Sequence, residues 1–94
     1  MKPEAQRVRI SLGRTVITAN AMATLDSDSI QNALRRHACG DWGDLSAEDR
    51  QENDLSAREG FRILSAYTDL NGTHFWIITE ADRSATTVLL PEDY

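Results

Sequence analysis

The C-terminal third of the chain carries the pattern that most restricts the fold. Residues 61–68 and 73–79 alternate apolar with polar side chains and are rich in aromatic and β-branched types, which is typical of strands. The Asn71-Gly72 dipeptide between them predicts a tight hairpin, because both residues accept a positive φ. Residues 85–90 predict a further strand, which Pro91 ends because proline lacks the N–H needed for pairing. This region therefore predicts an antiparallel sheet of three strands.

Two helices are predicted in the first half of the chain. The first is expected to run from the N-cap Asn20 to Leu25, and the second to cover residues 29–38 behind an N-cap at Ser27 or Asp28. One face of the second helix is expected to be buried, because four of its residues recur at spacings of three and four. These residues are Ile30, Ala33, Leu34 and His37.

A third helix is predicted over residues 46–59. Ser46 followed by Asp49 is a variant of the capping box, and Gly60 is placed to close the helix in a left-handed conformation. The helix has few large apolar residues of its own, chiefly Leu55. We therefore expect it on the surface, held by a narrow contact.

The N-terminal segment predicts a strand at one edge of the sheet. Residues 7–12 alternate apolar with polar side chains, and residues 15–18 are all β-branched. The two pieces form either a hairpin around Gly13, which we favour, or a loose lead-in to a short strand. Strand and helix units do not alternate as they do in α/β proteins. The chain is therefore expected to be one α+β domain over residues 1–94, with a small antiparallel sheet packed against two to three helices.

The net charge of the chain is confined to residues 41–59. The whole chain has a formal charge of −5, and this segment accounts for all of it, since seven carboxylates there face only Arg50 and Arg58. A neutral body with one acidic arm indicates a face directed at a positively charged partner. The carboxylates are Asp41, Asp44, Glu48, Asp49, Glu52, Asp54 and Glu59.

Composition excludes several classes of protein. The chain is 40% apolar and 27% charged, as in an ordinary globular domain. Cys39 is the single cysteine, so no internal disulfide forms and a reducing compartment is indicated. We see no signal-peptide pattern and no apolar stretch of membrane-spanning length. We therefore expect a cytoplasmic protein without a membrane partner.

The acidic helix predicted over residues 46–59 has two interpretations. At a rise of about 1.5 Å per residue it would be about 21 Å long, so its charges would be spaced comparably to the ~3.4 Å per charge on one DNA strand. It could therefore mimic nucleic acid in a groove lined by Lys and Arg on a DNA-binding enzyme. Alternatively, it is an ordinary solvated helix in which Arg58 pairs with Asp54.

Residues 37–44 gather a histidine, a cysteine and two aspartates. Such a group could hold a metal ion or form an acid–base pair. No second Cys/His pair follows downstream, so we expect no metal site. The histidine is instead expected to bond a carboxylate or a backbone carbonyl and to fix the turn after the second helix, with the tryptophan as a buried anchor. The residues expected to build this turn are His37, Gly40, Trp42 and Gly43.

The loop over residues 80–84 is a further candidate site, because connections between strands often carry function. Its charged residues could join His37 and Asp41 in a cluster that handles phosphodiesters. The same loop could equally be a self-satisfied turn, in which Asp82 bonds backbone N–H groups and Arg83 pairs with Glu80. Arg83 could also reach the acidic helix and fix it to the sheet.

Two dense motifs give the chain a resemblance to a known family. The first is Arg36-His37 followed by GDWGD over residues 40–44, and the second is WIITEADRS over residues 76–84 with the strand that follows it. Over residues 36–94 the chain resembles a family of short proteins carried by bacterial plasmids and prophages. Its members are often labelled plasmid-related or type I restriction subunit. The resemblance implies a mobile-element context, but it implies no catalytic residue.

The function expected from the sequence is a non-enzymatic inhibitor encoded by a mobile genetic element. Its partner would be a protein with a basic nucleic-acid-binding groove, such as a restriction or CRISPR complex in the bacterial cytoplasm, and the chain itself would bind no nucleic acid. Two alternatives stay open: a small hydrolase or nuclease built on the cluster around His37, and a self-associating plasmid-maintenance module. We expect a monomer or a weak homodimer, without cofactor or metal.

Overall fold

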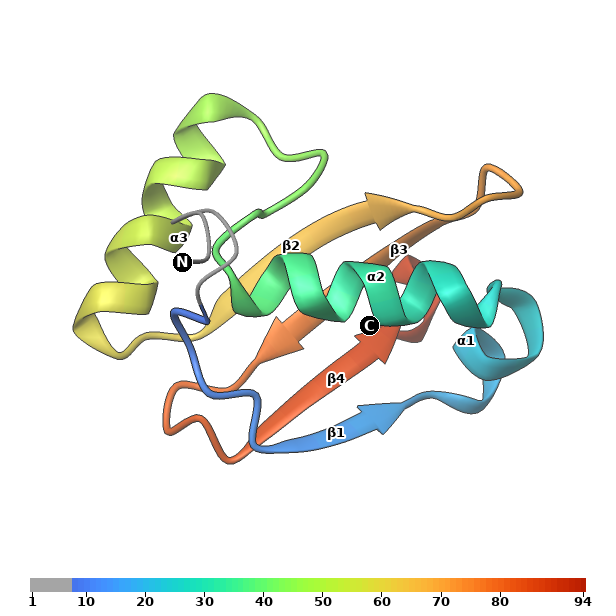
Figure 1. The fold of residues 1–94 in the computed structure, drawn as a ribbon, viewed down its shortest axis with the longest axis horizontal. Coiled ribbons are helices and arrows are strands. Elements are labelled where there is room, and N and C mark those ends of the chain that lie inside the picture. Colours follow the sequence, from blue (N-terminus) through green and yellow to red (C-terminus); the bar gives the residue numbers. More distant parts are fainter. Residues whose placement is uncertain (1–7) are drawn as a thin grey trace, which may run out of the picture.

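The computed structural model describes residues 8–94, which form an α+β fold with one four-stranded sheet (Figure 1). The predicted fold class is confirmed. In chain order the elements are β1 (Arg14–Ile17), α1 (Ala19–Thr24), α2 (Ser27–Ala38), α3 (Ala47–Glu59), β2 (Ile63–Thr68), β3 (His74–Thr79), β4 (Ala85–Leu89) and the 3-10 helix η2 (Pro91–Asp93).

The sheet has the order β1-β4-β3-β2 and is mixed. The three C-terminal strands pair antiparallel, as predicted, with Ile63 opposite Thr79 and Trp76 opposite Leu89. β1 joins the other side of β4 in parallel, so the prediction of an antiparallel sheet is wrong for this strand. Parallel neighbours need a long crossover, and all the elements between β1 and β4 supply it.

The predicted hairpin around Gly13 is wrong, and the alternative, a lead-in to a short strand, is correct. Residues 8–13 form no strand. The backbone N–H groups of Arg9 and Ile10 donate to the carbonyl of Ala38 at the end of α2. This contact buries Ile10 and leaves Val8 73% exposed, so the alternation of the sequence does not continue into the structure. The first residue of the predicted strand lies outside the described residues.

The helices lie where they were predicted, with small shifts at their N-termini. Thr18, and not Asn20, caps α1, because its side chain accepts a hydrogen bond from the N–H of Ala21. Asp26 caps α2 in place of Ser27 or Asp28. The caps of α3 are those predicted: Ser46 accepts from the N–H of its third helical residue, and the closing glycine has a φ of 81°.

The turn between β2 and β3 is one residue longer than predicted, because β3 begins at His74 and not at Thr73. Residues 69–73 separate the strands, and the Asp69 carboxylate accepts hydrogen bonds from the N–H groups of Asn71 and Thr73. A third hydrogen bond to this carboxylate comes from the N–H of Asp26 before α2. Only Gly72 of the predicted pair has a positive φ. A buried carboxylate therefore organises this turn, and the turn type follows from it.

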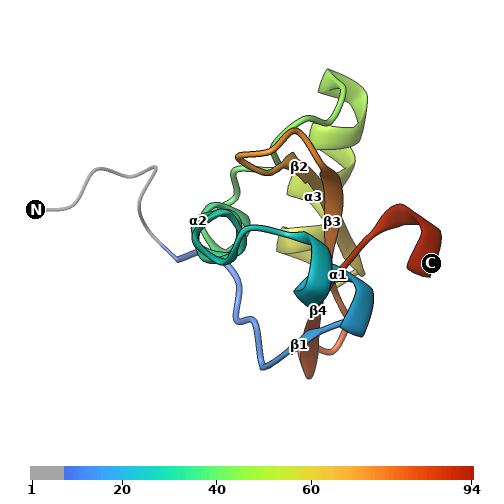
Figure 2. The same ribbon diagram turned by 90° about the vertical axis from the view of Figure 1, so that its right-hand side faces the viewer.

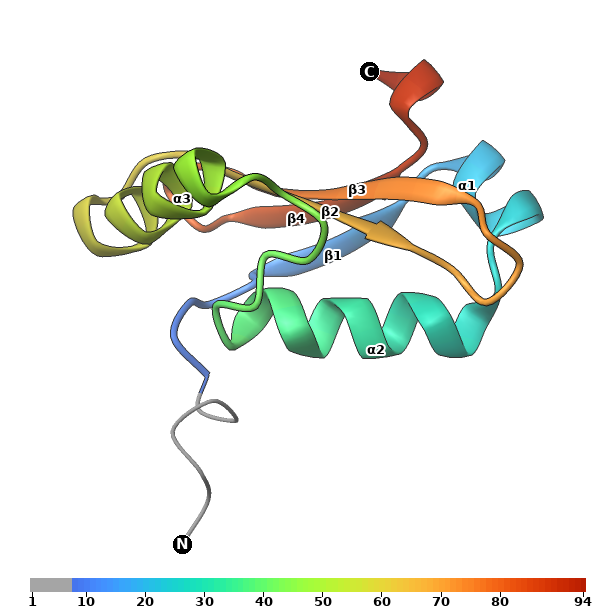
Figure 3. The same cartoon turned by 90° about the horizontal axis from the view of Figure 1, so that it is seen from above.

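The main core lies between α2 and the sheet. α2 covers one face of the sheet, while η2 and the C-terminus lie on the other side (Figures 2 and 3). A smaller apolar cluster of Ile10, Trp42 and Ile63 lies at the end nearer α3. The main cluster consists of Ala21, Leu25, Ile30, Ala33, Tyr67, Phe75, Ile77, Val88 and Leu90.

Candidate functional site

The acidic helix α3 is attached to the body by polar contacts. Asn53 is its buried residue, and the side-chain amide donates to the carbonyl of Leu64 on β2 at 2.6 Å. Arg50 donates to the carbonyl of Gly43 at 3.0 Å. Because these anchors are neutral groups and one arginine, the helix is fixed without using its glutamates.

Three carboxylates near the N-terminal half of α3 point into solvent. Glu48, Asp49 and Glu52 are exposed, and none of them forms an ion pair with another residue in the range 8–94. One side of the helix carries Glu48, Glu52, Leu55 and Glu59, because these residues follow one another at spacings of four, three and four. Leu55 is itself exposed. We call Glu48, Asp49 and Glu52 the acidic stripe.

The other four carboxylates of the predicted face are engaged or lie elsewhere. Asp41 forms an ion pair with Arg36 at 2.8 Å, and the hydrogen bond from that guanidinium lowers the pKa of Asp41. Asp44 accepts a hydrogen bond from Thr68 Oγ1 at 2.9 Å, and Asp54 accepts one from Trp42 Nε1 at 2.9 Å. Glu59 forms an exposed ion pair with Arg58 at 3.9 Å. Asp54 lies on the flank of α3 opposite Glu52, at a helical spacing of two. The predicted face of seven carboxylates is thereby reduced to the acidic stripe, with Glu59 beside it.

The loop over residues 80–84 holds the end of α3 against the sheet. The Arg83 guanidinium donates to three backbone carbonyls: Phe61 at 2.7 Å, Ser56 at 2.8 Å and Glu80 at 3.1 Å. Arg83 therefore contacts Glu80 through the main chain and not through the carboxylate. Asp82 accepts from the N–H of Ser84, as in the self-satisfied turn considered above. Arg83 also has a φ of 62°, and its three bonds offset the cost of that conformation.

His37 lies in the core at 0% exposure, and both its ring nitrogens meet hydroxyl groups. Nδ1 lies 2.5 Å from Ser65 Oγ and Nε2 lies 2.8 Å from Thr79 Oγ1. The expected bond to a carboxylate or a backbone carbonyl is absent from the described contacts of this ring. The sequence does not indicate these hydroxyls as partners of the histidine, because Ser and Thr residues occur in many strands without such a role. Their inward positions on β2 and β3, opposite the apolar face of α2, were the available signal.

The polar chain continues from His37 across the sheet and fixes the direction of every proton. Thr86 Oγ1 donates to the carbonyl of Leu12 at 2.7 Å, so Thr79 Oγ1 must donate to Thr86, at 2.7 Å. The hydroxyl of Thr79 can then only accept from His37, which puts the ring proton on Nε2. Burial, with the charge of Arg83 as a smaller cause, lowers the pKa of His37 to about 4. The ring is therefore neutral at pH 7, and Nδ1 accepts from Ser65.

The alternative catalytic cluster does not come together. His37 is buried with both nitrogens occupied, whereas a general base needs an open cleft and a carboxylate or water within reach. Asp41 pairs with Arg36, and Glu80, Asp82 and Arg83 form the loop described above. Among the described residues no group of three or more His, Cys, Asp or Glu side chains is arranged to hold a metal ion. The geometry gives no support to a nuclease or hydrolase.

The turn between α2 and α3 is built from close packing. Trp42 is buried and meets the His37 ring edge-on at 5.6 Å between centroids. Gly43 forms an isolated bridge with Ala66 on β2, and a Cβ at Gly43 would lie 2.0 Å from the Ala66 carbonyl oxygen. Gly40 has a φ of 83°. These residues position α3 and have no group free for chemistry.

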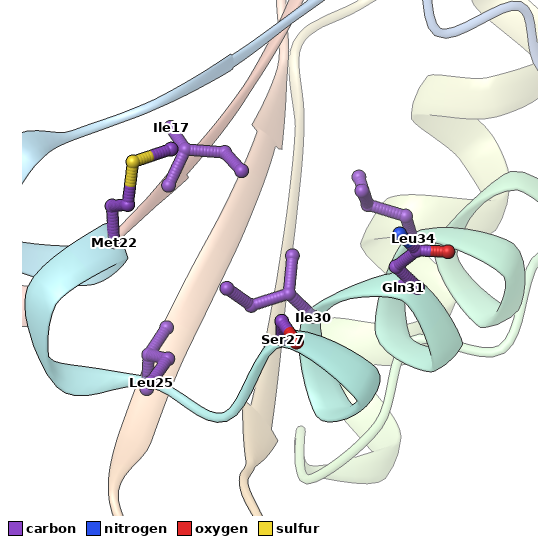
Figure 4. A pocket seen from close by; sticks show the side chains of 7 residues that line it. All are labelled: Ile17, Met22, Leu25, Ser27, Ile30, Gln31 and Leu34. Carbon is purple, nitrogen blue, oxygen red and sulfur yellow. The ribbon is translucent and has the colours of Figure 1, made fainter.

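The surface cavities of the described part of the chain include two of similar volume. One, of about 340 Å³, is apolar and lies between β1, α1 and α2 (Figure 4), where Ile17, Met22 and Leu34 line it. The other, of about 380 Å³, lies between Arg9, Trp42 and Arg58. Neither contains a cluster of nucleophiles or acid–base groups. No helix in residues 8–94 is long and apolar enough to cross a bilayer.

Comparisons with protein-family models, with curated proteins and with solved structures find no match for this chain.

Proposed function

We propose that this chain is a non-enzymatic inhibitor that presents the acidic stripe in place of DNA phosphates. The observation that carries the proposal is that Glu48, Asp49 and Glu52 have no ion-pair partner within residues 8–94, although the chain has exposed arginines on the same helix. Carboxylates that form ion pairs within the same chain would be weak ligands for a groove lined with cations. Carboxylates that are exposed to solvent without such partners attract a cationic groove over a Debye length of about 8–10 Å.

The attachment of α3 supports the same proposal. The anchors through Asn53, Arg50 and Arg83 dock the helix on its inward side, so the acidic stripe is presented on a folded helix and not on an unstructured tail. A folded ligand loses less conformational entropy on binding than a flexible acidic tail does. Glu48 and Glu52 are about 6 Å apart along the axis at 1.5 Å per residue, which is nearly twice the ~3.4 Å rise per phosphate on one DNA strand, and Asp49 lies between them along the axis.

The partner we propose is a host defence complex that binds DNA, namely a type I restriction enzyme or a CRISPR effector. The support for this choice is the resemblance of residues 36–94 to short proteins of plasmids and prophages, whose elements must survive such systems. The site of action would then be the bacterial cytoplasm. The partner would contribute a groove lined with Lys and Arg, and the chain would contact no nucleic acid itself.

The proposal is tested by phage plating on two bacterial strains, one with an active type I restriction system and one with an active CRISPR system. Expression of the chain should raise plating by at least about tenfold on one of them. The variant Glu48→Gln/Asp49→Asn/Glu52→Gln should lose this protection, because it keeps shape and removes charge. The matched control, Asp28→Asn/Glu80→Gln/Glu92→Gln, removes the same charge from exposed sites off α3 and should protect like the wild type.

A result in which the chain protects neither strain would count against these partners. Equal protection by both triple variants would contradict the acidic stripe as the binding surface, even if protection itself is real.

A further inference from the structure

β1 leaves one edge of the sheet unpaired. It is the outermost strand in the order β1-β4-β3-β2, and no element lies beyond it in Figure 1. Its first three residues, Arg14, Thr15 and Val16, are exposed, and Val16 has 40% of its surface in solvent. Edge strands are usually protected by proline, charged side chains or a bulge. β1 has one charged residue, Arg14, at its start, and is β-branched over Thr15–Ile17.

The unpaired backbone groups of β1 are those of Thr15 and Ile17. The N–H groups of Arg14 and Thr18 donate to Ser84 and Val88, each at 3.0 Å, so these residues direct their backbone groups toward β4. Successive residues of a strand alternate in this respect. Thr15 and Ile17 therefore direct their N–H and C=O groups outward, ready to pair with another strand.

We propose that β1 pairs antiparallel with β1 of a second copy of this chain, with Val16 on the two-fold axis. A two-fold axis perpendicular to the sheet keeps each face continuous, so residues opposite each other must point to the same face. With Val16 opposite the partner's Val16, Thr15 lies opposite the partner's Ile17. Both of these residues have outward backbone groups, so each such pair exchanges two hydrogen bonds.

Charge complementarity selects a second copy and this register. Arg14 forms no ion pair with any residue in the described range, and in this register it lies opposite the partner's Thr18. In each copy the Thr18 hydroxyl donates to Asp93 at 2.7 Å, and Asn20 donates to the same carboxylate at 2.7 Å. Arg14 of one copy therefore reaches the partner's Asp93, and the contact occurs twice.

The faces of the sheet agree with this ion pair. Arg14, Val16 and Thr18 alternate with Ile17, which packs against the core on the α2 side, so they point away from α2. Asp93 belongs to η2, which lies on that same side of the sheet (Figure 3). A register shifted by two residues, with Thr15 on the axis, would place Arg14 opposite the partner's Val16 and farther from that carboxylate.

The dimer is expected to be weak. Pairing through one short strand buries much less than the roughly 800 Å² per partner of a standard interface. We therefore expect a dissociation constant in the range of about 10 µM to 1 mM. This inference does not depend on the proposed function, since the β1 edge and the acidic stripe share no residue.

The register is tested by oxidative cross-linking in a Cys39→Ala background, which removes the native thiol. Val16→Cys should form a disulfide-linked dimer, because residues on the axis are a non-hydrogen-bonded pair with Cα atoms about 4.5 Å apart, within disulfide range. Thr15→Cys should not, because its two copies are separated by two residues along the strand and lie beyond about 7 Å. Non-reducing mass spectrometry distinguishes the products. Cross-linking at Thr15→Cys alone, or at neither position, would overturn the proposal.

Sedimentation equilibrium tests the association itself. The wild-type mass should rise toward the dimer as concentration increases to about 1 mM, whereas Val16→Lys and Arg14→Glu should stay monomeric. The controls Leu70→Lys and Arg35→Glu make the same changes at exposed positions away from β1 and should dimerise like the wild type. Circular dichroism confirms that each variant is folded. A monomeric wild type at every concentration would overturn the proposal.

Discussion

At the scale of single residues, His37 is an ionisable group with no exposed surface. The ring has no contact with solvent, and its two nitrogens are matched by one donor and one acceptor. The hydroxyl of Ser65 can donate to or accept from Nδ1, so these bonds fit either protonation state. Burial favours the neutral form, because it removes the water that would solvate the charge.

This environment predicts a pH dependence of stability. The pKa of His37 is lowered from 6.5 to about 4, so between these values the unfolded chain binds a proton that the folded chain does not. Stability should be complete above pH 6.5 and should fall by about 3 kcal/mol as the pH falls to 4. Urea unfolding at several pH values measures this loss. Carboxylates with a lowered pKa, such as Asp93, lose their contribution as the pH falls below about 4 and do not explain it.

Two variants make the pH prediction specific. His37→Gln should lower stability at pH 7 and flatten the slope between pH 6.5 and pH 4, because the titrating group is gone. His74→Gln, at the exposed start of β3, is the matched control for the substitution itself and should unfold like the wild type at pH 7. A slope that persists in His37→Gln would show that another group carries it.

Glycine positions give a second prediction at this scale. Gly43→Ala places a methyl group 2.0 Å from the Ala66 carbonyl at a positive φ, so we expect a loss of about 2–5 kcal/mol in the free energy of unfolding. Gly60→Ala has the same conformational strain but meets open space, and should cost about 1–2 kcal/mol. Thermal unfolding compares the two. Equal losses would mean that the close approach at Gly43 does not control stability.

The sequence predicts the helix caps but not the hydrogen-bond partners of His37. The cap Ser46 and the left-handed Gly60 follow from rules that act within one turn of helix, and the structure has them as predicted. The partners of His37 come from strands 28 and 42 residues later. No local pattern pairs a histidine with particular hydroxyls at such separations, so the polar chain required the fold.

At the scale of elements, α3 is a helix held by few contacts. It has one buried residue, Asn53, and its inward side contains no large apolar side chain that would bury much surface against β2. Its stability relative to the body therefore depends on individual hydrogen bonds. An element of this kind is expected to open locally while the sheet stays folded.

Removing the main anchor should release α3 alone. Asn53→Ala leaves the Leu64 carbonyl without its side-chain donor and should weaken the docking by about 1–2 kcal/mol, so amide hydrogen exchange in α3 should become about 5–30-fold faster. Exchange in β3 and β4 should not change. Gln51→Ala, at an exposed position of the same helix, is the matched control. Faster exchange across the whole protein would contradict local opening.

The elements could be predicted where the signal was local. Alternation and turn residues give β2, β3 and β4 and their antiparallel pairing, and spacing gives the buried face of α2. The direction of β1 could not be predicted, because a strand near residue 15 can pair with residues near 86 in either direction. The lead-in over residues 8–13 alternates like a strand, yet its hydrogen bonds go to the end of α2.

At the scale of the whole molecule, the arginines and the carboxylates around α3 have different roles. The arginines that bind backbone carbonyls, Arg50 and Arg83, hold the acidic helix to the sheet. The acidic stripe is left to solvent. The sequence predicted the concentration of charge in residues 41–59 but not its division, since which carboxylates are engaged depends on tertiary neighbours such as Arg36 and Thr68.

The central claim, that the acidic stripe takes the place of DNA on a defence complex, is tested most directly by displacement. Labelled duplex DNA bound to a purified type I restriction enzyme or CRISPR effector is titrated with this chain, and the anisotropy of the label is followed at about 50 mM and 200 mM salt. We predict displacement that weakens at least tenfold at the higher salt and is lost in Glu48→Gln/Asp49→Asn/Glu52→Gln. Displacement that is equally strong for that variant, or the same at both salt concentrations, would contradict the claim.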